Sequence, residues 1–145
     1  MTPVFSDSLK SGKNTEEEVC TLIKKKYPSA YVVEGYCKEH DIVIPEIQKT
    51  VEVKRDEKSH FTGNYVVEIE FNGEPSALST TKSDWWVFVD KARYVWITPD
   101  YLRQLVNSYK PVKFIGEGDT KEKKAYLIPV TRFTNDPCVV VYERK

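Results

Sequence analysis

The stretch that decides the fold is residues 41–55, which read D-I-V-I-P-E-I-Q-K-T-V-E-V-K-R. Two runs rich in β-branched residues, 41–44 and 50–55, are joined by a short polar connection, and this pattern predicts two adjacent strands. Successive side chains of a strand point to opposite faces, so Glu52 and Lys54 point the same way, roughly 6–7 Å apart along the strand. Val51 and Val53 alternate with them along the strand and point to the other face, into a core.

The same stretch brings acidic and basic groups together. An antiparallel return places Asp41 near the head of the neighbouring strand, on the face that carries Glu52 and Lys54. Hard divalent cations such as Mg²⁺ take oxygen ligands, often one or two protein carboxylates with water and phosphate completing the shell. Two carboxylates beside one ammonium group therefore suit metal-assisted hydrolysis of a phosphodiester bond. The alternative is an ordinary strand-end acid, with Glu52 and Lys54 as a solvent-facing pair.

Length and charge bound the possibilities. The chain has 145 residues, which predicts one domain spanning residues 1–145. Its 22 basic and 22 acidic residues balance, so no global field indicates a nucleic-acid partner. Three local runs, at 24–26, 54–55 and 121–124, are candidate basic patches, although a solvated helix face or loop accounts for each run taken singly.

The cysteines and the absence of apolar runs indicate the compartment. Cys20, Cys37 and Cys138 lack the paired spacing of a zinc site, so we expect buried free thiols in a reducing environment. No signal-peptide pattern opens the chain, and no apolar run approaches membrane-spanning length. We therefore expect a cytoplasmic protein with no membrane partner.

A helix is expected before the strands. Residues 1–13 are polar, with glycine and proline, and predict a flexible arm. Asn14 or Thr15 then caps a helix that runs to about Lys26, because its first turn is acidic and its last turn is basic. The predicted buried stripe consists of Val19, Leu22, Ile23 and Tyr27. At about 100° per residue, Glu16 falls near the centre of that stripe, whereas Glu17 and Glu18 fall outside it. This placement marks Glu16 as a candidate site residue, with a capping or dipole role as the alternative.

The rest of the chain predicts more strands and one further helix. Alternation at 65–71 places Tyr65 and Val67 on one face and Glu68 on the other. Residues 85–89 and 93–97 predict a hairpin, and residues 98–106 predict a helix with Thr98 as its cap and Pro99 at its first position. Further strands are expected at 112–115, 125–130 and 139–142.

The spacing D-x₁₀-E-x-K, together with this order of elements, resembles the PD-(D/E)XK nuclease superfamily, the fold of many restriction enzymes and archaeal-type Holliday junction resolvases. Asp41 matches the aspartate of the motif, Glu52 its variable acid and Lys54 its lysine, while His40 stands where the motif has proline. Glu16 matches a glutamate that the superfamily often carries on its first helix. The resemblance covers roughly residues 16–106 and implies an α/β fold with a restriction-endonuclease-like αβββαβ core, a mixed central sheet and extra C-terminal strands.

A softer resemblance joins residues 62–64 and several later polar residues to small nuclease-like proteins of phages and bacteria. The later residues are Glu68, Ser76, Thr80, Thr81, Asp84 and Trp86. This resemblance implies a bacterial cell, or a host cell infected by a phage, as the protein's location.

The superfamily resemblance also implies roles. Asp41, Glu52 and the backbone carbonyl of Val53 would bind Mg²⁺, for which Mn²⁺ can substitute, and Glu16 would hold a second metal or a metal-bound water. Lys54 would orient the attacking water and stabilise developing negative charge. The implied protein is a Mg²⁺-dependent endonuclease that hydrolyses DNA, either selecting DNA by its structure or acting as a dimer on duplex or branched DNA. Because duplex cleavage needs two scissions and one small domain holds one site, we expect a homodimer. The alternatives are a nuclease-fold module that binds DNA or a protein without cutting, and a small α/β interaction module without chemistry.

Overall fold

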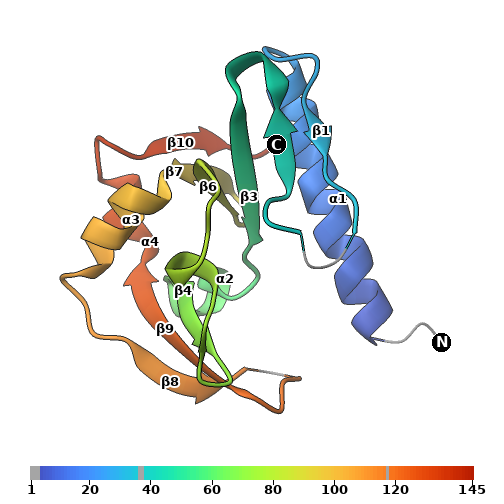
Figure 1. Cartoon of the computed structure of the whole chain (residues 1–145). Coiled ribbons are helices and arrows are strands. Elements are labelled where there is room, and N and C mark those ends of the chain that lie inside the picture. Colours follow the sequence, from blue (N-terminus) through green and yellow to red (C-terminus); the bar gives the residue numbers. More distant parts are fainter. Residues whose placement is uncertain (1–3, 36–37, 117) are drawn as a thin grey trace.

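The computed structural model of the chain describes residues 4–35, 38–116 and 118–145, with only the backbone described for residues 4–13. Two β-sheets lie beside each other, and a long helix covers one of them (Figure 1). The helices, including the short 3-10 segments η1 and η2, are α1 (Val4–Lys24), η1 (Pro45–Ile47), α2 (Ser59–Thr62), η2 (Ala77–Ser79), α3 (Pro99–Val106) and α4 (Val130–Thr134). The strands are β1 (Tyr31–Val32), β2 (Ile42–Ile44), β3 (Lys49–Arg55), β4 (Asn64–Phe71), β5 (Glu74–Pro75), β6 (Trp85–Val89), β7 (Arg93–Ile97), β8 (Val112–Ile115), β9 (Glu122–Pro129) and β10 (Val140–Glu143).

The larger sheet is mixed, as the sequence predicted. Its strand order is β1-β2-β3-β6-β7-β10, and β3 and β6 are parallel whereas the other neighbours are antiparallel. One face of this sheet packs against α1, where Val19 and Ile23 meet Val51, Val87 and Val89 in a buried cluster. The parallel step from β3 to β6 requires a long crossover, and the chain uses it to build β4 and β5 of the second sheet.

The smaller sheet supplies a second core. Its order is β5-β4-β9-β8, antiparallel throughout. Tyr65 and Val67 of β4 and Ile128 of β9 pack with Trp86 and Phe88 of the larger sheet and with the buried side of α3. Alternation along β6 therefore divides its side chains between the two cores, with Val87 and Val89 toward α1 and the two aromatic residues toward the smaller sheet.

Several predicted elements are confirmed in their bounds. Strands β6 and β7 occupy the predicted residues, and β2, β3 and β8 lie within a residue or so of their predicted positions. Helix α3 begins at Pro99, and the Thr98 hydroxyl oxygen accepts a hydrogen bond from the backbone N–H of Tyr101 at 3.2 Å. Within the residues described, no helix is long and apolar enough to cross a membrane.

Other predictions are wrong in ways that have a physical explanation. Helix α1 begins at Val4, so its backbone continues through residues 4–13, where an arm was expected. A local cap signal at Asn14 does not prevent a helix from starting earlier, and a glycine inside a helix costs only about 1 kcal/mol. Leu22 lies outside the buried stripe and is exposed, while Cys20 takes its place in the core. Cys138 is exposed rather than buried, and Cys37 lies outside the described residues.

A buried hydrogen bond joins the two sheets. The hydroxyl of Tyr65 in β4 donates to Asp90 Oδ2 at 2.5 Å, and both residues are almost completely buried. The other oxygen of Asp90 accepts the backbone N–H groups of Ala92 and Arg93 at 2.7 and 2.8 Å, which fixes the turn between β6 and β7. Burial, reinforced by the bond to Asp90, raises the pKa of the Tyr65 hydroxyl well above its ordinary range. The hydroxyl therefore stays protonated and remains a donor.

We expect Tyr65→Phe to lower the free energy of unfolding by about 1–3 kcal/mol, because it leaves a buried carboxylate oxygen without its strong donor. Tyr31→Phe is the matched control, since Tyr31 is 50% exposed and should tolerate the change. Urea-induced unfolding of both variants measures the difference. Equal stability of the two variants would show that this bond contributes nothing to the junction of the sheets.

Candidate functional site

The site begins where the hairpin between β2 and β3 stops. Strand β2 pairs with β3 only as far as Ile42 and Val51, while β3 continues to Arg55 with β6 as its neighbour on the other side. Asp41 stands at this point. Its N–H donates to Val51 O at 2.9 Å, and its Oδ2 accepts the N–H of Val53 at 2.7 Å. The Asp41 carboxylate thus replaces a strand partner at the open edge of β3.

This edge also directs a carbonyl oxygen toward the site. The N–H and C=O groups of one strand residue point to the same edge of the strand. Since the Val53 N–H points to Asp41, the Val53 carbonyl faces the same side. The backbone ligand implied by the resemblance is therefore available beside Asp41.

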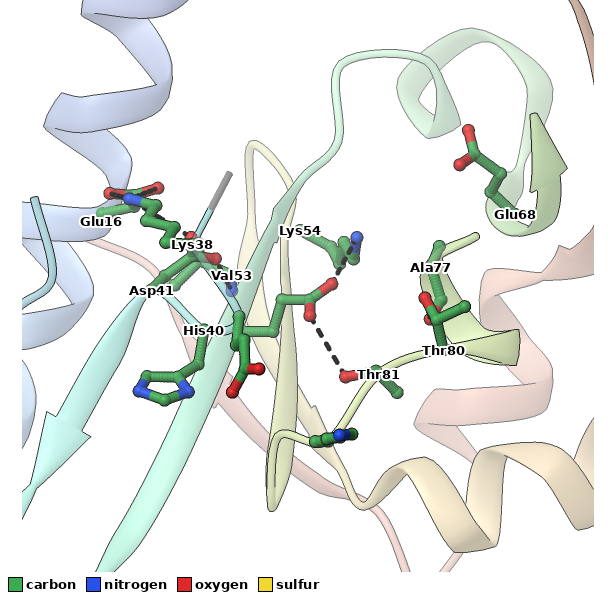
Figure 2. Close-up of a pocket in the computed structure, with 13 residues that line it drawn as sticks. Glu16, Lys38, His40, Asp41, Val53, Lys54, Glu68, Ala77, Thr80 and Thr81 are labelled. Atoms are coloured by element: carbon green, nitrogen blue, oxygen red, sulfur yellow. Dashed lines mark hydrogen bonds and ion pairs between the residues drawn. The ribbon is translucent and has the colours of Figure 1, made fainter. Parts of the chain in front are cut away.

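An open pocket of about 570 Å³ lies along this edge (Figure 2). It is lined by Glu16, Lys38, Glu39, His40, Asp41, Glu52, Val53, Lys54, Glu68, Ala77, Thr80, Thr81 and Lys82. Glu16 and Lys38 reach it from the side of α1, whereas Thr80 and Thr81 reach it from the segment after η2. All five predicted site residues (Glu16, Asp41, Glu52, Val53 and Lys54) thus lie around one pocket.

Glu52 is held from two sides. Lys54 Nζ lies 2.6 Å from Glu52 Oε2, and the Thr81 hydroxyl lies 3.2 Å from Oε1 (Figure 2). The Lys54 ammonium also lies 4.7 Å from the centre of the Trp86 ring, a distance at which a cation is attracted to the ring face. Lys54 is therefore positioned by a carboxylate and an aromatic ring together.

Thr81 orients this carboxylate through its single hydroxyl hydrogen. Its oxygen accepts the indole N–H of Trp86 and the backbone N–H of Ser83, both at 3.2 Å. Two accepted bonds occupy both lone pairs of a hydroxyl oxygen, so the hydroxyl hydrogen is left to donate to Glu52. In the sequence, Thr81 belongs only to the softer resemblance, because no local pattern shows that it meets a strand roughly thirty residues earlier in the chain.

Glu16 enters the site through a lysine that the sequence analysis missed. Lys38 Nζ lies 2.9 Å from Glu16 Oε2, 3.1 Å from its Oε1 and 3.4 Å from Asp41 Oδ1. Burial raises the pKa of Glu16, opposed by the bond from Lys38 and reinforced by the nearby charge of Asp41. Burial works against the charge of Lys38, but its bonds to Glu16 and Asp41 outweigh burial and raise its pKa, so the ammonium form is favoured. Glu16, which the angular argument placed on the inward side of the helix, is half-buried and lines the pocket.

The neighbouring acids and histidines have other surroundings. Glu17 is exposed, while Glu18 pairs with Arg144 at 2.7 Å, accepts a hydrogen bond from Tyr94 and lines a second, separate pocket. The bonds from Arg144 are the main reason that the pKa of Glu18 is lowered. His40 lines the pocket, whereas His60 is exposed on α2 and packs edge-on against the ring of Phe61.

The donor set fits a hard divalent cation in its chemistry. Asp41, Glu52 and the Val53 carbonyl supply oxygen atoms, and each carboxylate retains acceptor positions beyond the bonds described above. Mg²⁺ commonly uses one or two carboxylates and completes its shell with water and phosphate oxygens. Among the described side chains, no group of three or more His, Cys, Asp or Glu residues is close enough to hold a metal.

Searches of protein-family models, curated proteins and solved structures return no match to this chain. Function is therefore inferred from the geometry of the pocket and the chemistry of its residues.

Replacing Asp41 tests the open edge directly. We expect Asp41→Ala to leave the Val53 N–H without an acceptor and to speed hydrogen exchange of that amide by at least about tenfold, since a buried unpaired donor costs about 1–3 kcal/mol. Asp41→Asn keeps an oxygen acceptor and should retain most of the protection. Amide exchange followed by NMR measures both variants. Unchanged exchange in Asp41→Ala would mean that the carboxylate does not close this edge.

Proposed function

We propose that the protein is a metal-dependent endonuclease that hydrolyses phosphodiester bonds of DNA. The observation that supports this most directly is the meeting of Asp41, Glu52 and the Val53 carbonyl with the Lys54 ammonium around one open pocket. Clustered charges of this kind are costly inside a folded protein, and a structural role for Glu52 and Lys54 would not require an open pocket.

Each residue has a defined part in the proposed reaction. A divalent ion held by Asp41, Glu52 and the Val53 carbonyl would polarise the phosphate and lower the pKa of bound water. Lys54 stabilises negative charge that develops on the phosphate oxygens, because it is a fixed ammonium close to where the substrate would lie. Thr81 keeps the Glu52 carboxylate aligned, so that it does not rotate away when a substrate enters.

The order of elements supports a restriction-endonuclease-like core. Helix α1 is followed by three antiparallel strands, and a parallel crossover then leads to β6 beside β3. The arrangement departs from the plain αβββαβ order in one place. The crossover carries the strands β4 and β5 rather than one long helix, and α3 follows β7. Strand β4, η2 and the segment after η2 form the wall of the pocket that supplies Glu68, Ala77 and Thr81.

A binding role without chemistry is the second candidate. Its specific support is that Glu16 and Asp41 share Lys38, while Glu52 is paired with Lys54. A pocket in which acids are neutralised by lysines can bind a nucleic acid or a protein without a metal ion. Whether the parent protein cleaves DNA with Mg²⁺ decides between the two candidates.

Cleavage should depend on three residues of the pocket. With Mg²⁺ or Mn²⁺, we expect Asp41→Asn and Glu52→Gln to lower turnover by at least about 100-fold, and Lys54→Ala to lower turnover more than it weakens ion binding. Glu57→Gln is the control, because Glu57 is an exposed acid just beyond β3. Glu16→Gln should impair cleavage more than Glu17→Gln. A panel of duplex, nicked, flapped, branched and single-stranded DNA measures these rates, and full activity in all of the pocket variants would refute the assignment.

A homodimer is the simplest assembly that cuts both strands of a duplex. Strand β10 forms one edge of the six-stranded sheet and carries the exposed side chains of Val140, Val141 and Tyr142. The tryptophans of the hairpin are a poorer contact surface, because Trp86 is buried and the other two are half-buried. We propose that β10 pairs with β10 of a second copy about a two-fold axis.

Sedimentation at micromolar concentration tests this assembly. The parent protein should sediment as a dimer and Val141→Lys as a monomer, because a lysine on an edge strand opposes pairing. Ile115→Lys on the other sheet is the matched control and should stay dimeric, since Ile115 is exposed on β8. A parent protein that is monomeric both alone and on DNA would rule out the dimer and would predict nicked rather than linear product.

A further inference from the structure

The Lys38 ammonium lies among oxygen atoms. It is 3.1 and 2.9 Å from the two carboxylate oxygens of Glu16, 3.1 Å from the backbone carbonyl of Val33 and 3.4 Å from Asp41 Oδ1. An ammonium group has three hydrogens to donate, so these contacts use all of them. The three residues that accept from Lys38 are Glu16 in α1, Val33 directly after β1 and Asp41 directly before β2. Lys38 therefore ties together three segments at one end of the pocket.

The position of Lys38 is also unusually enclosed for a lysine. Its side chain is 20% exposed, with Glu16 at 16% and Asp41 at 13%. Lys54 of the same pocket is more open, at 33%, and so is Lys49, which pairs with Asp84, at 49%. Long charged side chains usually keep their heads in water. The burial of this head indicates that the surrounding oxygens need a cation at this place.

The same oxygens are the kind that hard divalent cations use, namely carboxylates and a backbone carbonyl. We propose that the Lys38 ammonium is a built-in cation at the pair formed by Glu16 and Asp41, and that it excludes a divalent ion from this end of the pocket. An ion placed there would need the lone pairs that Lys38 already uses and would meet its positive charge at close range.

This inference rests on the proposed function and makes it more specific. The protein then uses one divalent ion, on the side of Asp41 that faces Glu52 and Val53. Glu16 has no direct bond to that ion and acts as a positioning residue, because it holds Lys38 and through Lys38 one oxygen of Asp41. The second-metal role that the resemblance implies for Glu16 is replaced by the side chain of Lys38.

Counting bound Mn²⁺ tests the proposal without measuring cleavage. Titrations of the full chain, followed by calorimetry and by the electron paramagnetic resonance signal of free Mn²⁺, give the number of ions and their affinity. The parent protein should bind one ion. Lys38→Met should bind one ion more, because it frees the oxygens of Glu16, Val33 and Asp41 while changing the volume little. The double variant Lys38→Met with Glu16→Gln should lose that additional ion.

Two further variants separate contact from charge. Lys82 lines the same pocket and is exposed, so Lys82→Met removes an equal charge without freeing these oxygens. It should bind one ion, as the parent does. Lys38→Arg keeps a cation and should also bind one ion. Thermal unfolding checks the fold: Lys38→Met should melt lower than the parent without metal and should recover with Mn²⁺. If Lys38→Met does not fold without metal, Lys38→Gln against Lys38→Arg gives the same contrast.

The outcomes separate this inference from the proposed function. If the parent and Lys38→Met each bind one ion with equal affinity, Lys38 excludes nothing and the inference fails, while the metal site of the proposed function stands. If the parent binds none and Lys38→Met binds one, the inference holds and the metal at Asp41 and Glu52 is refuted. Two ions on the parent overturn the inference, and no ions on either protein overturn both.

Discussion

The hydrogen bond from the Val53 N–H to the Asp41 carboxylate is the constraint on which the rest of the site depends. Strand β3 is longer than its antiparallel partner β2, so part of its edge has no neighbouring strand. Exposed strand edges attract unwanted pairing, and here a side chain rather than a strand satisfies the edge. The result is that a carboxylate, a strand carbonyl and the side chains of Glu52 and Lys54 are all directed to one opening in the sheet.

The two cores hold the remaining parts of the site on either side of this opening. Val19 and Ile23 fix α1 against one face of the larger sheet, and this packing sets the position of Glu16. Trp86 belongs to the other core, and its indole N–H reaches Thr81, which in turn reaches Glu52. The packing of the two cores therefore also positions the site, because Glu16 lies on a helix held by one core and Glu52 is bonded through Thr81 to a tryptophan of the other.

Electrostatics in the pocket is a balance of paired groups. Each acid that could bind a cation is already beside a lysine, Glu16 and Asp41 beside Lys38 and Glu52 beside Lys54. Such pairing balances the negative charges without a metal ion, at a site where like charges would otherwise repel. The two lysines differ in surroundings, since Lys54 lies against the Trp86 ring on the open side while Lys38 is enclosed by oxygens. Lys54 is therefore placed for the proposed contact with phosphate, and Lys38 for the proposed exclusion of a second ion.

Local sequence alone determined most of the strands and the faces on which several candidate site residues lie. Alternation in residues 50–55 predicts the shared face of Glu52 and Lys54, and helical periodicity predicts that Glu16 points inward, because both depend only on the geometry of one element. Only the tertiary structure decided that Lys38 lies between Glu16 and Asp41 and that Thr81 holds Glu52, since these contacts join segments distant in the chain. The exposure of Leu22 was likewise decided by packing. A periodic pattern shows which side of a helix is apolar, but the sheet that the helix meets determines which residues of that side are covered.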